Sequence, residues 1–169
     1  GAGEMKLKRI LKHLFAPQWI VARAFPRRAL AAVEAAIHAS EKSHDGELRF
    51  AVEGGLHPLP LARGQSARAR AIELFSSLRV WDTERNSGVL IYVQLVDRRI
   101  EIIADRGISA KVEQGEWDAI CRGMEAAFRL RKYEQGALEA IGQATLLLSR
   151  HFPPQGGNPD ELPDRPVVL

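Results

Sequence analysis

The most informative segment for the fold of this chain is Gly88-Val-Leu-Ile-Tyr-Val-Gln-Leu-Val-Asp97-Arg98-Arg-Ile-Glu-Ile-Ile-Ala-Asp105-Arg106-Gly107. Two runs rich in β-branched residues, 89–96 and 100–104, flank a short polar break, which predicts an antiparallel hairpin with a tight turn at Asp97-Arg98. The first run is apolar at positions that would face both sides of a strand. Such a strand needs cover on both sides, and this favours helices above and below the sheet.

The whole chain has the size and composition of one globular domain. It contains 169 residues, of which 46% are hydrophobic and 27% charged, enough to bury a substantial core. No uninterrupted apolar run reaches the roughly 18 residues of a membrane-spanning helix, and we recognise no secretory signal. The single cysteine, Cys121, argues against a disulfide framework and a cysteine-rich zinc site. We therefore expect a cytoplasmic protein.

The formal net charge of +3 comes from the N-terminal segment. Residues 1–28 contain seven Lys or Arg and one Glu, whereas the rest of the chain contains 17 Lys or Arg and 20 Asp or Glu. A nucleic-acid-binding domain usually carries its positive charge on the folded surface, with aromatic residues interleaved. This distribution therefore argues against a nucleic-acid partner.

Residues 1–25 are predicted to form a basic N-terminal arm, in which residues 1–4 resemble an expression remnant. Between Met5 and Phe15, apolar residues recur at helical spacing with Lys, Arg and His elsewhere, which predicts a basic amphipathic helix. Two interpretations remain open. The helix lies on an anionic membrane surface, which would make the protein peripheral at the inner membrane, or its apolar stripe packs on the domain or on a partner.

The domain itself is predicted over residues 26–152. It should contain, in order, a helix over 26–41, a strand over 47–53, a loop over 54–64, a helix over 65–80, the hairpin and two further helices that end near 151. The first two strands and the helix between them form a βαβ unit, which should be parallel and right-handed. The expected fold is α/β, a three-layer α/β/α sandwich with a small mixed sheet. Residues 153–169 are rich in Pro and Gly and predict an extended or disordered tail.

This topology gathers polar residues at one edge of the sheet, where the first two strands begin and the third strand ends. The residues expected there are His44, Asp45, Glu47, Asp82, Glu84, Asn86, Asp105, Arg106 and Gly107. Clustered oxygen atoms in loops suit a hard cation such as Ca²⁺ or Mg²⁺. The alternative is a solvated acidic loop in which Asp105 pairs with an arginine. The opposite end, at Asp97-Arg98, is predicted to be only a turn.

The segment 81–108 resembles the TPM-domain family. The resemblance is carried by Trp81-Asp-Thr-Glu, Asn86-Ser-Gly88, Asp97-Arg-Arg and Asp105-Arg-Gly107, and by Ser40-Glu41-Lys-Ser-His44-Asp-Gly46-Glu47-Leu48, a pattern of one bacterial branch. It extends over about residues 26–152 and implies an α/β/α sandwich. In this family some members bind divalent cations, calcium included, one plant relative has acid phosphatase activity, and many bacterial members are membrane-associated. We expect this chain to belong to a branch without the signal peptide and C-terminal spanning helix of those members.

These features together predict a divalent-cation-binding module with an interaction role near the membrane surface and a protein partner. The expected metal ligands are Asp82, Glu84 and Asp105. The expected accessory or ligand-binding residues are His44, Glu47, Asn86, Gly88, Arg106 and Gly107. Arg106 would orient a carboxylate or hold an anionic ligand. Two alternatives from other classes are a metal-assisted acid phosphatase, in which the cation polarises a phosphoryl oxygen, and a metal-free structural or protein-interaction domain.

Overall fold

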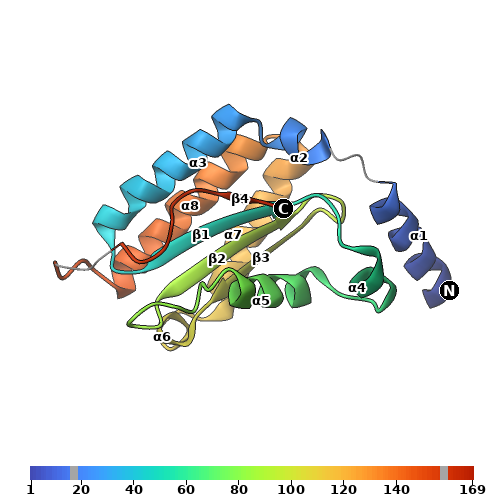
Figure 1. Ribbon diagram of the computed structural model, residues 1–169. Coiled ribbons are helices and arrows are strands. Elements are labelled where there is room, and N and C mark those ends of the chain that lie inside the picture. The colour runs from blue at the N-terminus through green and yellow to red at the C-terminus, as the bar shows by residue number, and fades with distance from the viewer. Residues whose placement is uncertain (16–18, 157–159) are drawn as a thin grey trace.

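The protein, described here by a computed structural model over residues 1–15, 19–156 and 160–169, is built around one mixed sheet with helices on both faces (Figure 1). The elements are, in chain order, α1 (Ala2–Leu14), α2 (Trp19–Ala24), α3 (Arg27–Ser40), the 3₁₀ turn η1 (Glu41–Ser43), β1 (Glu47–Glu53), α4 (Pro58–Ala62), α5 (Ala67–Ser77), β2 (Gly88–Gln94), β3 (Arg99–Ala104), α6 (Arg106–Ser109), α7 (Gln114–Arg129), α8 (Tyr133–His151) and β4 (Val167–Val168). The predicted three-layer α/β sandwich is confirmed.

The sheet has the strand order β3-β2-β1-β4. Strands β1 and β2 pair in parallel, with Glu47 opposite Gly88, while β2 and β3 pair antiparallel, with Val89 opposite Ala104. Both the βαβ unit and the hairpin are therefore confirmed. Strand β4 was not predicted, and it pairs in parallel with the second half of β1. The alternative of a disordered tail is thus wrong for residues 160–169, which run back along β1 as an extended segment (Figure 1).

The two faces of the sheet have separate cores, as the apolar pattern of the hairpin requires. On one face, alternate residues of β1, β2 and β3 pack against α2, α3, α7 and α8, around Phe25, Phe50 and Trp117. On the other face, Leu90 and neighbouring residues pack against α5 and the tail. Residues that face opposite sides of β2 are equally inaccessible to water, because each side has its own helical cover.

The predicted amphipathic helix is confirmed as α1. The side of the helix that faces the domain, however, is not the apolar one. Its polar side contacts the domain: Arg9 Nη2 lies 2.9 Å and His13 Nε2 2.8 Å from the Asp97 carboxylate, and His13 Nδ1 accepts a hydrogen bond from the Leu56 amide at 2.8 Å. Its leucines at positions 7, 11 and 14 remain about half exposed, and Phe15, directly after the helix, is 79% exposed. The interpretation that the apolar stripe packs on the domain is therefore wrong, and α1 is held by the β2–β3 turn and by the segment that precedes α4.

A buried ion pair stabilises the α5 face of the sheet. The guanidinium of Arg70 donates two hydrogen bonds, of 3.0 and 2.9 Å, to the Glu53 carboxylate, which also accepts one from the Tyr92 hydroxyl at 2.7 Å. Glu53 is almost inaccessible to water. Removing one partner of a buried pair leaves the other charge unpaired, which costs more than the pair contributes.

We expect Arg70→Ala to lower the free energy of unfolding by roughly 2–3 kcal/mol, slightly below the values for fully buried pairs, because Arg70 retains contact with water. Urea denaturation measures the change. Arg68→Ala is the matched control on the same helix, since its ion pair with Glu101 is more exposed than the pair of Arg70 with Glu53 and should contribute about 1 kcal/mol or less. Equal losses in the two variants would contradict this account.

Candidate functional site

The predicted edge exists, but it does not bring the three expected metal ligands together. Asp82 is exposed and accepts a hydrogen bond from Arg79 Nη2 at 2.8 Å. Glu84 is also exposed, and its backbone amide donates to Glu161 Oε2 at 2.9 Å. Asp105 caps the first turn of α6 by accepting from the Arg106 amide at 2.7 Å. Asp82 and Asp105 thus have separate local contacts, and none of the three expected ligands belongs to a group of converging ligand atoms within the described residues, although Asp105 Oδ2 is also buried without a hydrogen-bond partner there.

The glycines and Asn86 of this edge have steric and backbone roles. Asn86 adopts a positive φ of 52°, and its carbonyl accepts a hydrogen bond from the Gly107 amide at 3.0 Å. A Cβ at Gly107 would collide with the carbonyls of Arg85 and Asn86, and one at Gly88 would collide with the carbonyl of Val80. These residues therefore allow two loops to approach closely. Arg106 is exposed, on the first turn of α6.

His44 belongs to an internal hydrogen-bond chain. Its Nδ1 accepts from the Gly46 amide at 3.0 Å, and its Nε2 lies 2.7 Å from Ser40 Oγ, which in turn lies 2.7 Å from Thr145 Oγ1. Both ring nitrogens are therefore engaged within the protein. Burial lowers the pKa of His44, although the bond from Gly46 and the charge of Asp45 oppose that shift. The neutral ring connects α3 to α8 and is not positioned as a metal ligand.

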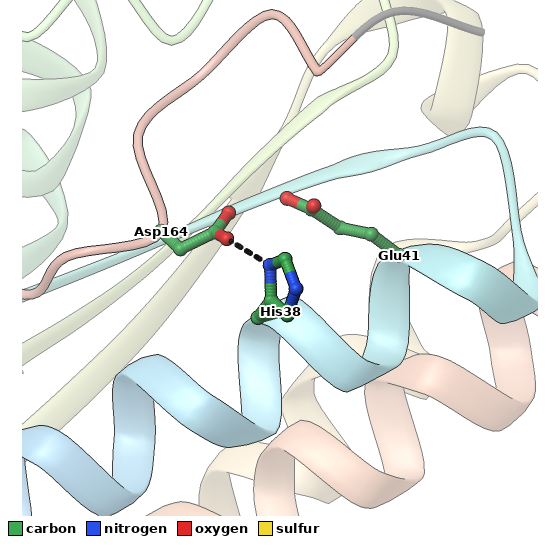
Figure 2. A group of neighbouring side chains, drawn as sticks. All are labelled: His38, Glu41 and Asp164. Atoms are coloured by element: carbon green, nitrogen blue, oxygen red, sulfur yellow. Dashed lines mark hydrogen bonds and ion pairs between the residues drawn. The ribbon is translucent and has the colours of Figure 1, made fainter.

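A different set of carboxylates converges beside the predicted edge. Within the described part of the chain, two groups of side chains place potential metal-ligand atoms within 4.8 Å of one another: Glu41, Glu47 and Asp160, and His38, Glu41 and Asp164. Glu41 is common to both groups. Figure 2 shows its carboxylate directed toward Asp164, whose Oδ2 lies 3.0 Å from His38 Nδ1. We call these five residues the carboxylate cluster.

The carboxylate cluster contains buried oxygen atoms without partners. Glu41 Oε1, Glu47 Oε2 and Asp164 Oδ1 are inaccessible to water and have no hydrogen-bond partner in the described parts of the chain. Glu47 is only 2% exposed. An unpartnered buried carboxylate oxygen is costly unless a proton or a cation neutralises the group. One cation can satisfy oxygens from several of these side chains at once.

The environment of the cluster raises the pKa values of its acids. Burial, followed by the Asp164, Asp160 and Glu47 carboxylates, raises the pKa of Glu41 to about 9. Burial is also the main reason that the pKa of Glu47 rises to about 7, with further contributions from the charges of Asp160 and Glu161, against hydrogen bonds from backbone amides. Burial and Asp164 raise the pKa of Asp160. The cluster therefore holds protons near neutral pH unless a cation replaces them.

The C-terminal tail is what completes the cluster. Arg49 on β1 donates to the carbonyls of Pro163 and Arg165, at 2.9 and 2.5 Å, and the Glu161 amide donates to Glu47 Oε1 at 3.3 Å. These bonds hold Asp160 and Asp164 beside the end of α3 and the start of β1. Sequence reasoning placed Glu47 at the correct edge but missed the tail. The available signal was an acidic run, Asp160-Glu161 and Asp164, in a Pro-rich segment.

Comparison with known proteins agrees with this architecture. A family model described as the TPM domain matches residues 21–145. The NMR structure of the BA42 protein from the psychrophilic bacterium Bizionia argentinensis is similar, with a TM-score of 0.74 and 28% identity, over 84% of this chain and 93% of that chain.

A second similar structure supports the fold alone. The N-terminal domain of a protein from P. gingivalis, solved by NMR, aligns with a TM-score of 0.62 and 16% identity, over 81% of this chain and 90% of that chain. Among curated protein sequences, no significant match is found. The family model covers most of the chain, including α3 and β1, whereas the tail that carries Asp160 and Asp164 lies outside the matched residues. The chain therefore belongs to the TPM-domain family.

Proposed function

We propose that this TPM domain binds a divalent cation, Ca²⁺ or Mg²⁺, through the carboxylate cluster, and that it has an interaction role near a membrane surface. The observation that carries the first part is the set of three buried, unpartnered oxygens on Glu41, Glu47 and Asp164. Carboxylate oxygens are the preferred ligands of both ions. The group formed by Glu41, Glu47 and Asp160 offers oxygen atoms only, which favours a hard cation over a transition metal.

The raised pKa values support the same proposal. Carboxylates that repel one another in a partly buried site hold protons at higher pH than free acids do, and a cation that enters the site releases those protons. The predicted ligands Asp82 and Asp105 do not belong to such a group of neighbouring carboxylates. Each of them instead has a separate local contact. We therefore assign the ion to the carboxylate cluster in preference to the loop between α5 and β2.

Calcium titration by calorimetry and NMR tests this assignment. Wild-type protein should bind calcium, with resonance changes around residues 38–47 and 160–165. Glu41→Gln should weaken binding by roughly tenfold or more, because Glu41 contributes to both groups of potential ligands. Asp82→Asn is the matched control and should bind as the wild type does.

Three outcomes are distinguishable. Loss of binding in Asp82→Asn with normal binding in Glu41→Gln would place the ion in the loop that the sequence indicated. No response of the wild type to millimolar calcium or magnesium would refute cation binding and leave a metal-free interaction domain. Binding that fails only in Glu41→Gln supports the carboxylate cluster.

The interaction role rests on α1. This helix is fixed to the domain through Arg9 and His13, yet its apolar residues Leu7, Leu11 and Leu14 are about half exposed. A helix that turns its polar side to the domain and its apolar side to water is suited to bind another surface. None of the described helices has the length and apolar character needed to cross a bilayer.

A further inference from the structure

A hollow lies between α2, the β2–β3 turn and the α7–α8 turn, with a volume of about 450 Å³, in the size range of small-ligand sites. The lining side chains that matter here are the guanidinium groups of Arg23, Arg98 and Arg131 and the rings of Trp19, Phe128 and Tyr133. We call this site the arginine hollow. It lies at the end of the sheet where β2 finishes, away from the carboxylate cluster at the start of β1 (Figure 1).

The positive charge of the arginine hollow is not neutralised within the described residues. Arg23, Arg98 and Arg131 make no ion pair there, and Arg23 instead lies over the Trp19 ring at 5.5 Å. An adjoining hollow of about 350 Å³ shares Arg23 and Arg131 and adds Arg28 and Lys132, with Glu134 as its acidic residue. Guanidinium groups bind phosphate oxygens in a bidentate manner, so a phosphate group fits this chemistry.

Two of these arginines occupy backbone positions at which glycine is normally favoured. Arg98 has a φ of 53° and Arg131 a φ of 59°. Arg131 follows the end of α7, where its amide donates to the Phe128 carbonyl at 2.9 Å and the Lys132 amide donates to the Ala127 carbonyl at 3.0 Å. A positive φ alone does not mark a ligand site, since Arg79 has one as well. The positive φ is useful for an experiment, because glycine can replace Arg98 or Arg131 without backbone strain.

The arginine hollow and α1 are both connected to the β2–β3 turn. Asp97, which binds Arg9 and His13 of α1, immediately precedes Arg98 in the turn. Figure 1 places α1, α2 and this turn at the same end of the molecule. Trp19, on the rim of the hollow, is 55% exposed. Cationic groups for a phosphate therefore lie beside apolar side chains that can enter the acyl boundary, which is the chemistry of a phospholipid surface.

We propose that the arginine hollow binds the phosphate headgroup of an anionic phospholipid while α1 inserts its apolar side into the same leaflet. This inference deepens the interaction role proposed above and does not depend on the cation site. Binding would direct the β2–β3 end of the domain toward the bilayer. The carboxylate cluster would then remain in water, accessible to ions.

Vesicle co-sedimentation tests the proposal, in EDTA and at about 0.1 M salt, where charges more than about 10 Å from the bilayer are screened. Wild-type protein should bind vesicles of phosphatidylglycerol in phosphatidylcholine and should not bind pure phosphatidylcholine. The double variant Arg98→Gly with Arg131→Gly should bind roughly 25-fold more weakly, at about fivefold per charge. Arg79→Gly is the matched control, because Arg79 has the same backbone geometry at the other end of the sheet; it should change binding by less than about twofold.

The variants should remain folded, and thermal unfolding checks this. Normal vesicle binding by the folded double variant would overturn the arginine hollow as the lipid site. An equal loss of vesicle binding in Arg79→Gly would show that binding depends only on the net charge of the protein.

Leu11→Glu should also weaken vesicle binding, because it places a charge on the apolar side of α1. If Leu11→Glu instead dissociates a wild-type dimer detected by light scattering, the occupant is a second copy of the chain and the lipid proposal fails.

A titration with inorganic phosphate separates the two sources of the headgroup chemistry. Phosphate-induced NMR shifts at Arg98 and Arg131 without vesicle binding would identify a free phosphate ligand and overturn the lipid assignment. Failure of wild-type protein to bind any anionic vesicle would refute the membrane role as well. Neither result affects cation binding, which the calcium titration measures independently.

Discussion

Replacing Gly88 by alanine is expected to lower the free energy of unfolding by about 4 kcal/mol or more, or to prevent folding. A Cβ at this position would collide with the backbone carbonyl of Val80, which cannot move aside as a flexible side chain could. Gly88 also begins β2 and accepts a hydrogen bond from the Asp105 amide at 2.8 Å. Relief of the collision would therefore disturb both the end of α5 and the hairpin.

Gly142→Ala provides the matched control for this prediction. Gly142 lies in α8, exposed, with no atom near the position of a Cβ. Alanine in a helix interior should stabilise the protein by about 1 kcal/mol relative to glycine. Urea denaturation and an NMR fingerprint spectrum measure both variants. If Gly88→Ala were as stable as the wild type, the steric role would be contradicted. The predicted ligand-binding role of this glycine would then need a separate test.

The stability of the cation-free protein should fall as the pH rises from about 5 to 9. The pKa of Glu47 is raised from 4.5 to about 7 and that of Glu41 to about 9, so the folded state retains protons that the unfolded state has lost. Stability from these groups is therefore complete below pH 4.5 and declines as pH rises through the folded-state pKa values. Glu47 alone would contribute a loss of roughly 3–4 kcal/mol at most, at about 1.4 kcal/mol per pKa unit.

Glutamine variants make this prediction specific. Glu47→Gln resembles the protonated acid, so in EDTA it should be more stable than the wild type at pH 9 and nearly equal at pH 4.5. Thermal unfolding across this pH range measures the difference. Calcium should restore the wild type at high pH and have little effect on the double variant Glu41→Gln with Glu47→Gln. If the unfolding temperatures of wild type and Glu47→Gln changed in parallel with pH, the raised pKa of Glu47 would be contradicted.

The hairpin illustrates how much the local pattern determines. Alternation of apolar residues on both faces of 89–96 predicts a strand with two covered sides, and each side indeed has its own core. The pairing of β1 with β2 follows equally directly, since a helix between two strands leads to a parallel crossover. Helix α1 was likewise predictable from helical spacing, although which side of it would face the domain was not.

The metal ligands illustrate the opposite case. Topology brings Asp82, Glu84 and Asp105 to one edge of the sheet, but side-chain distances at that edge depend on local partners such as Arg79 and the Arg106 amide. Periodicity contains no information about these contacts. The prediction of shared carboxylates therefore specified this end of the sheet but, among the residues of the carboxylate cluster, only Glu47.

The α/β sandwich, the strand pairing and the amphipathic arm are predictable from the chain alone, because each follows from the spacing of apolar residues along a short segment. Packing between distant elements places the tail along β1 and brings Asp160 and Asp164 to Glu41 and Glu47. It likewise brings Arg23, Arg98 and Arg131 to one hollow. Both groupings join residues far apart in the chain, and contacts of that kind depend on packing between elements, which no local pattern encodes.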